Sequence, residues 1–409
     1  MRLFAVWLLL VVSIQTSFGW GQGHRKIREW AVARLPEWQR DWVGAENLQR
    51  LCVDYKSLQD MNAGGKNPHL DPYCKVPDVR LSLHDVNGAE VSSKANLWYL
   101  KQIADCLSRG DIDEGMKFLG VLCHWNEDPG CPSAHSSPIN EAQLKILIPP
   151  PPDKARYNYL FGAGGIADVG QYEIPEAKYQ PRLLGRTREE AALRIYQHQR
   201  LLERNAAARI VPLVQDMMHG DGSKAAAQRA AAAADNARHV CDVIHTALCL
   251  AKERFSGGRA MPAEQALSEW LPNPIGKRAP HPYYVTGFLV NQAMDAKRKL
   301  HPLGARQGFG TGAPFRIGYT LTPNVFRRFR VRAGFHSTAG KGGAVVFEVH
   351  ANGKRIHRSR NLRVGDQPVT MDVELPETSS LKLELVTVAE NPADSLDNLV
   401  VWGDPVLLK

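Results

Sequence analysis

The sequence predicts a multidomain chain in which a mainly α-helical domain is followed by an all-β sandwich. Between about residues 20 and 255, apolar residues recur at spacings of three and four, which is the period of an amphipathic helix. From Ser256 the composition changes to stretches rich in glycine and proline. Towards the C-terminus, short alternating runs of apolar and polar residues are separated by turn signals, a pattern typical of a β-sandwich.

Residues 1–19 are predicted to be a secretory signal peptide. Arg2 supplies a positive start, an apolar run extends from Leu3 to Ile14, and small residues in Ser17–Gly19 suit the cleavage site. The apolar run is too short to span a bilayer comfortably. We therefore expect a secreted or periplasmic chain that begins at Trp20 and has no transmembrane segment, with an uncleaved anchor as the alternative.

Helical periodicity defines the first domain, which we place at residues 20–275. Pro149–Pro152 predicts a stiff extended break within it. The alanine run after Ala225 favours helix, because alanine is the best helix former. The segments expected to be helical are 27–35, 95–107, 114–124, 189–218 and 225–252.

The second domain is placed at residues 307–409, after a linker or boundary segment at 276–306. Ala351–Lys354 contains an Asn-Gly pair, which is a strong hairpin-turn signal. The segments expected to be strands are 326–331, 344–350, 369–375, 381–388 and 399–402.

Charge and cysteine content restrict the class of protein. The net charge of +9 indicates an anionic partner such as nucleic acid, phospholipid or acidic polysaccharide, without choosing among them. Seven cysteines suit an exported protein with some disulfides, and the odd number leaves at least one unpaired. We expect Cys123 and Cys131 to form a disulfide, with metal ligation by these thiolates as the alternative.

Signal-peptide cleavage would create a metal-binding group at the new N-terminus. The freed α-amino group of Trp20 and its carbonyl oxygen can chelate a metal in a five-membered ring. His24 is close enough in the chain to add an imidazole nitrogen. This part of the prediction requires the bond between Gly19 and Trp20 to be cut.

The strongest chemical signal is the pair His124 and Asp128. Residues four apart share one face of a helix, so the two side chains can hold one ion. Imidazole nitrogen with carboxylate oxygen is an ordinary zinc donor set. Asp60 and His84 precede this pair, and His135 follows it.

The order Trp20, His24, Asp60, His84, His124, Asp128 and His135 resembles the zinc-dependent phospholipase C and single-strand-specific nuclease superfamily. The resemblance covers residues 20–140 well, whereas residues 141–255 share only the helical periodicity. It implies one zinc held by Asp60, His84, His124 and Asp128. It implies a second zinc held by the Trp20 amine and carbonyl with His24, with Asp128 bridging the two ions or lying close to both. His135 would belong to this second site or to a third zinc.

The resemblance also implies hydrolysis of phosphodiesters with two or three zinc ions. Asp60 and Asp128 are then the candidate catalytic residues, Asp60 as proton acceptor or as ligand only. The sequence departs from the superfamily after His135, where no histidine is followed four residues later by Asp or Glu. Substitutes for the missing ligands would be His198 with Glu203, or members of the set Asp235, His239, Asp242 and His245.

Residues 307–409 resemble the carbohydrate-binding module first noticed on glycoside hydrolases and abbreviated NPCBM. The residues that carry this resemblance are Phe329–Phe335, Gly342–Val349, Asn352–Lys354, Met371–Val373, Leu381–Val386 and Trp402–Asp404. The resemblance implies a jelly-roll sandwich whose loops bind sugar by aromatic stacking. Phe335 and Trp402 are equally well explained as core residues, so a structural or docking role stays open.

Two classes of function follow. The first is an exported zinc-dependent phosphodiesterase that hydrolyses phospholipid headgroups or single-stranded nucleic acid and carries a module for polysaccharide. The alternative is a catalytically degenerate surface protein. In it, zinc only stabilises the helical domain, and the β-module binds glycans or serves as a docking module.

Overall fold

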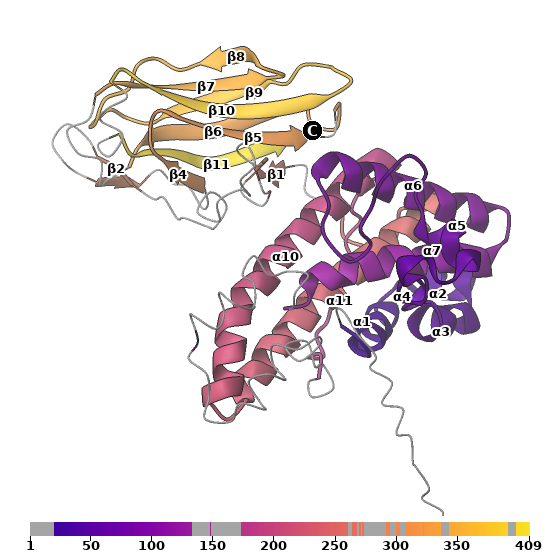
Figure 1. Ribbon diagram of the computed structural model, residues 1–409. Coiled ribbons are helices and arrows are strands. Elements are labelled where there is room, and N and C mark those ends of the chain that lie inside the picture. Colours follow the sequence, from indigo (N-terminus) through magenta and orange to yellow (C-terminus); the bar gives the residue numbers. More distant parts are fainter. Residues whose placement is uncertain are drawn as a thin grey trace, which may run out of the picture.

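A computed structural model shows a helical domain followed by a β-sandwich, which confirms the predicted fold class (Figure 1). The structure describes residues 20–132, 148, 173–260, 264–267, 270, 272–273, 292–294, 300–302, 308–321, 323–336, 343–391 and 398–409. The predicted signal peptide, His135 and the proline run Pro149–Pro152 lie outside the described residues. In the described residues, none of the helices is long and apolar enough to cross a membrane.

The helical domain combines short N-terminal helices with four long ones. The short helices are α1 (Gly23–Val32), α2 (Glu37–Val43), α3 (Ala45–Val53), α4 (Leu58–Met61) and α5 (Asp71–Cys74), with 3-10 turns at Ala63–Gly65 and Pro68–Leu70. The long helices are α6 (Ala89–Ser108), α7 (Ile112–Glu127), α10 (Arg188–His219) and α11 (Ser223–Lys252), and the turn η3 (Asp128–Gly130) continues α7. All five predicted helices are present, and α1 begins at Gly23 rather than at Ile27.

Helix α7 lies in the middle of the helical core, with α3, α6 and α11 packed around it. Its second half is buried on every side, from Phe118 to Glu127. The close approach to the segment after α3 requires Gly120, because a Cβ there would lie 2.6 Å from the carbonyl oxygen of Tyr55. Burial of a whole helix turn around His124 takes His124 and Asp128 out of bulk water.

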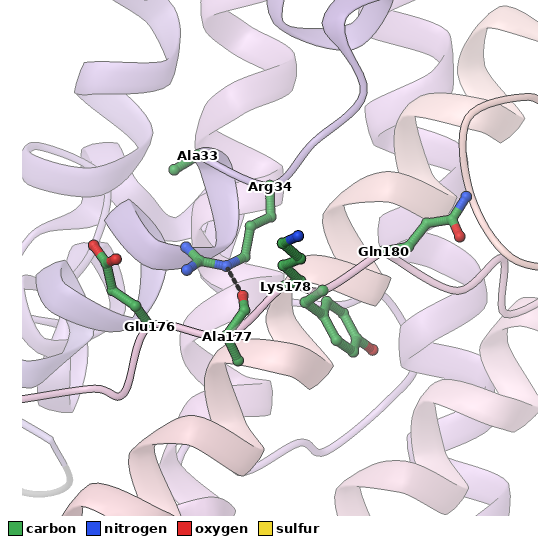
Figure 2. Close-up of a pocket in the computed structure, with 7 residues that line it drawn as sticks. Ala33, Arg34, Glu176, Ala177, Lys178 and Gln180 are labelled. Atoms are coloured by element: carbon green, nitrogen blue, oxygen red, sulfur yellow. Dashed lines mark hydrogen bonds between the residues drawn. The ribbon is translucent and has the colours of Figure 1, made fainter.

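An extended segment, residues 173–186, packs against the helices. Arg34 lies just after α1, and its Nε donates to the carbonyl oxygen of Ala177 at 3.1 Å (Figure 2). The indole of Trp30 donates to the carbonyl oxygen of Pro175 at 3.2 Å. The pocket drawn in Figure 2 lies at this junction, and none of the predicted metal ligands lines it.

The sandwich consists of two antiparallel sheets whose facing side chains form a second core. One sheet has the order β1-β11-β6-β9, with β4 also paired to β11, and the other has the order β5-β10-β7-β8. The strands of the first sheet are β1 (Glu264–Ala266), β4 (Gly308–Thr311), β6 (Arg328–Phe335), β9 (Val369–Glu374) and β11 (Val400–Leu408). Those of the second are β5 (Phe315–Leu321), β7 (Val345–Ala351), β8 (Lys354–Arg358) and β10 (Leu381–Ala389), and β2 (Gln292–Met294) pairs separately with β3 (Leu300–Pro302).

The five predicted strands correspond to β6, β7, β9, β10 and β11. The predicted hairpin turn is also present between β7 and β8, where Asn352 and Gly353 have φ values of 51° and 79°. This left-handed backbone is the conformation that an Asn-Gly hairpin turn requires. Phe335 and Trp402 are buried in the sandwich core, so the structure assigns them to packing.

The start of α10 joins the helical domain to the sandwich (Figure 1). Leu193 belongs to the apolar core of the sandwich. The Arg194 guanidinium donates to Gln265 of the β1 strand at 2.5 Å. Glu190 forms an ion pair with the C-terminal residue Lys409. The two domains therefore share apolar and polar contacts along one turn of a long helix.

Candidate metal centre

Five of the residues predicted from sequence converge on one site, although four separate segments carry them. Helix α1 carries His24, α4 carries Asp60, and the segment before α6 carries His84. His124 lies in the last turn of α7, and Asp128 begins the η3 turn directly after that helix. The spacing of four residues therefore places His124 and Asp128 one above the other, as the sequence predicted.

Asp60, His84 and His124 form one group of potential ligands. Asp60 Oδ1 lies 3.7 Å from His84 Nε2 and 3.7 Å from His124 Nε2. Two ligands of a tetrahedral zinc, each about 2.1 Å from the ion, lie roughly 3.4 Å apart. The spacing of these three atoms is therefore close to that of a zinc ligand set.

Asp128 connects this group to His24. Its Oδ2 lies 2.8 Å from His84 Nδ1 and 3.2 Å from His124 Nε2. Its Oδ1 lies 3.4 Å from His24 Nε2. The two oxygens of one carboxylate thus face two different groups of donors, which is the arrangement that a bridging carboxylate needs.

Three atoms of the site are buried and make no hydrogen bond within the described part of the chain. They are His24 Nε2, His124 Nε2 and Asp128 Oδ1. A buried polar atom without a partner costs free energy, so such atoms ordinarily have a partner, which can be a protein group, an ordered water or a bound ion. Two imidazole nitrogens and a carboxylate oxygen suit a divalent metal such as zinc. The residues present therefore fit the metal that the sequence resemblance implies.

Burial and charge pull the pKa values of the site in opposite directions. Burial acts to lower the pKa of His124, but Asp128, Asp60 and Glu127 raise it to about 9. Burial acts to raise the pKa of Asp128, yet His124, His24 and His84 hold it well below the usual range. The site is therefore an anionic pocket that attracts positive charge.

A second layer of residues orients the histidines, and sequence reasoning missed it. Glu127 Oε2 lies 2.5 Å from His24 Nδ1, and Arg28 Nε donates to Glu127 Oε1 at 2.8 Å. His124 Nδ1 lies 2.5 Å from the carbonyl oxygen of Lys56. The only sequence signal for this layer is that Arg28 follows His24 by four residues and so shares its helix face.

Trp20 is fully buried at the start of α1. Its indole donates to the backbone carbonyl of Glu127 at 2.8 Å, and its own carbonyl accepts from the Gly23 N–H at 2.8 Å. These contacts attach the beginning of the described chain to the residue before Asp128. Chelation by the Trp20 amine and carbonyl stays a prediction.

The prediction of a disulfide between Cys123 and Cys131 is wrong. No disulfide forms among the seven cysteines, all of which lie in described residues. Cys123 lies on the buried face of α7 near Arg28 and Cys52 of α3. Burial raises the pKa of its thiol, which disfavours the thiolate that metal ligation would need.

Most of the predicted substitutes for the missing ligands have protein partners elsewhere, and the His198 ring packs against that of His239 with centroids 5.7 Å apart. His239 Nε2 lies 2.9 Å from Asn126 Oδ1, and His245 Nδ1 lies 3.0 Å from Gln39 Oε1. Asp242 accepts from the Tyr179 hydroxyl at 2.7 Å. Asp235 pairs with Arg209 and Arg238, and Glu203 pairs with Arg200. Among the described residues, the two groups with metal-ligand spacing are His24, His124 and Glu127, and Asp60, His84 and His124.

The C-terminal domain matches a known domain family. Residues 291–408 match the family described as the NPCBM/NEW2 domain. This confirms the predicted NPCBM module. The NPCBM domain starts before β2 and ends within β11, so it contains all but the first strand of the sandwich. No curated protein matches the sequence of the chain.

Solved structures with similar folds include CBM51 modules and an alpha toxin. The CBM51-2 and INT domains of Clostridium perfringens ZmpB match with 16% identity and a TM-score of 0.29, over 37% of this chain and 32% of that chain. The tandem CBM51 modules of a family 98 glycoside hydrolase from Streptococcus pneumoniae match with 19% identity and a TM-score of 0.30, over 36% and 47%. This chain thus spans less than half of either one. An alpha toxin from Clostridium absonum matches with 11% identity and a TM-score of 0.35, over 95% of this chain and 94% of that chain. Since these TM-scores are low, we base the functional proposal on the side chains of the site.

Proposed function

We propose that the protein is an exported, zinc-dependent phosphodiester hydrolase whose NPCBM domain attaches it to a glycan-bearing surface. The observation that carries the proposal is the set of buried, unbonded atoms around Asp128, namely His24 Nε2, His124 Nε2 and Asp128 Oδ1. A purely structural cluster would satisfy these atoms with hydrogen bonds. Their convergence supports a metal site.

Asp60, His84, His124 and Asp128 would hold one zinc, and His24 with the freed Trp20 terminus would hold another. Bound zinc supplies Lewis acidity and generates a nucleophile from water near neutral pH. The side chain of Asp60 is 41% exposed, whereas those of His124 and Asp128 are fully buried. Asp60 is therefore the carboxylate at the solvent side of the site, where it can accept a proton from an incoming water. Asp128 lies on the buried side of the site, where its oxygens face His24, His84 and His124.

A phospholipid is the favoured substrate. Met61 directly follows Asp60 and is 56% exposed, the highest value for any large apolar side chain among the described residues. An exposed apolar side chain next in the chain to a candidate ligand is compatible with contact with a lipid surface. The net charge of +9 is compatible with an anionic membrane.

Two chromogenic substrates test the proposal on the mature, zinc-loaded protein. We expect hydrolysis of p-nitrophenylphosphorylcholine to exceed that of bis-p-nitrophenyl phosphate, and both to depend on added zinc. The reverse preference, with cleavage of single-stranded nucleic acid, would assign the nuclease activity instead. Folded protein that binds zinc but cleaves neither substrate would favour the glycan-binding class, in which zinc only staples the helical domain.

A further inference from the structure

Arg28 is a buried cation whose hydrogen-bonding capacity is fully used. Its guanidinium has no exposed surface, and its Nε donates to Glu127 at 2.8 Å. Nη1 donates to the carbonyl oxygens of Leu51 at 2.9 Å and Tyr55 at 3.0 Å, and Nη2 donates to that of Gly120 at 2.9 Å. These bonds come from α3, α7 and the segment after α3, so Arg28 has one fixed position.

Glu127 is equally buried, and Arg28 contacts both of its oxygens. Oε1 accepts from Arg28 Nε at 2.8 Å, and Oε2 accepts from Arg28 Nη2 at 3.2 Å. A buried ion pair contributes little net stability, because desolvation offsets the attraction. A buried pair next to a metal site therefore points to a role in that site.

The role is visible at His24. Glu127 Oε2 lies 2.5 Å from His24 Nδ1, and an ionised carboxylate can only accept a hydrogen bond. His24 Nδ1 must then carry a proton, and Nε2, which faces Asp128 Oδ1 at 3.4 Å, is the nitrogen left for a metal. The partner at one ring nitrogen fixes which nitrogen is available to a metal.

We infer that Glu127, held by Arg28, is a positioning residue that fixes His24 in the metal-binding tautomer. Glu127 lies within metal-ligand spacing of His24 and His124, but its Oε2 already accepts from Arg28 and from His24 Nδ1, so Glu127 acts through His24. Arg28 also donates to the backbone of Tyr55, next to Lys56, whose carbonyl accepts from His124 Nδ1. The same arginine therefore supports the orientation of both histidines. The effect on metal binding rests on the proposed function, whereas the tautomer does not.

The substitution Glu127→Gln tests the inference because it reverses one hydrogen bond. The glutamine oxygen can still accept from Arg28 Nε. Its amide group takes the place of the oxygen that accepted from Arg28 Nη2 and then donates to His24 Nδ1. His24 Nε2 would become protonated and unable to bind metal. We expect ¹⁵N spectra of the metal-free full chain to show a protonated His24 Nδ1 in the unsubstituted protein and an Nδ1 without a proton in the variant. We also expect zinc affinity to fall by about 10–100-fold.

Two further variants complete the test. Glu127→Asp keeps the charge beside Arg28 but withdraws the carboxylate from His24, so it should fold, lose the tautomer preference and bind zinc more weakly. If Glu127→Gln does not fold, the Glu127→Asp variant alone tests the positioning role. Glu29→Gln is the matched control, since Glu29 lies on the exposed side of α1 and pairs with Arg25.

The possible outcomes separate the two proposals. Unchanged His24 spectra and unchanged zinc affinity in both Glu127 variants would overturn the positioning role. A protein without zinc and without hydrolytic activity, in which the tautomer still switches, would overturn the proposed function and keep the positioning role.

Discussion

The imidazole rings of His24 and His124 stack with their centroids 4.0 Å apart, although the two residues lie on different helices. Both rings direct Nε2 towards Asp128, at 3.4 Å and 3.2 Å. Each ring also has an acceptor at Nδ1, supplied by Glu127 for one and by the Lys56 carbonyl for the other. Asp128 is therefore the residue on which the site is centred.

Replacing Asp128 with asparagine should remove most zinc and most activity. The variant lacks the carboxylate that faces both groups of donors, so we expect at least one zinc fewer per chain and a more than roughly 100-fold loss of phosphodiester hydrolysis. Metal analysis and the two chromogenic assays measure these effects. Asp41→Asn on the exposed side of α2 is the control. Equal zinc content in both variants would argue against a bridging role.

The metal-free protein should lose stability as the pH rises from about 6.5 to 9. Burial acts to lower the pKa of His124, but Asp128 and the other carboxylates raise it to about 9, above its unfolded value of 6.5. A raised pKa contributes stability that is complete below pH 6.5 and gone above pH 9. The free energy of unfolding should therefore fall by on the order of 3 kcal/mol across this window.

Urea unfolding in the presence of a chelator measures that pH dependence. His124→Gln should flatten the curve between pH 6.5 and 9, and His69→Gln, in an exposed turn, should leave it unchanged. The same proton must leave His124 before a metal binds, so zinc affinity should rise with pH over this range. A curve that keeps its slope in His124→Gln would contradict the assignment.

Gly120→Ala tests the packing that places α7. The added Cβ would lie 2.6 Å from the Tyr55 carbonyl oxygen, which is backbone and cannot rotate away. We expect a loss of about 1–3 kcal/mol in unfolding free energy, as for other overpacked cores. Gly88→Ala meets nothing within 4 Å and should change stability by less than about 0.5 kcal/mol. Urea denaturation of the two variants gives the comparison.

Trp402 should affect the stability of the sandwich. It is 1% exposed and packs edge-on against Phe347 with ring centroids 5.1 Å apart. Trp402→Ala should destabilise the chain by about 3–5 kcal/mol, measured by calorimetry. Val388→Ala, at an exposed position of β10, is the matched substitution and should have little effect. Loss of glycan binding without loss of stability would instead make Trp402 a sugar contact.

Local sequence pattern predicted the elements of the fold and the parts of the site that lie within one helix. The spacing of His124 and Asp128 is a property of one helix, so the sequence alone could predict that they act together. The pairing of Glu127 with Arg28 depends on which faces of α1 and α7 meet, and no local period contains that information. The disulfide prediction was wrong for the same reason, because the packing of α7 turns Cys123 towards α3. Strand β5 was missed because Gly318 interrupts a short run next to a glycine-rich stretch.

The zinc content of the mature, correctly processed protein tests the central claim most directly. We predict two or three zinc ions per folded chain by elemental analysis, and loss of most of them in His124→Ala. A folded, correctly processed sample that contains no zinc and takes up none from zinc-supplemented buffer would contradict the account.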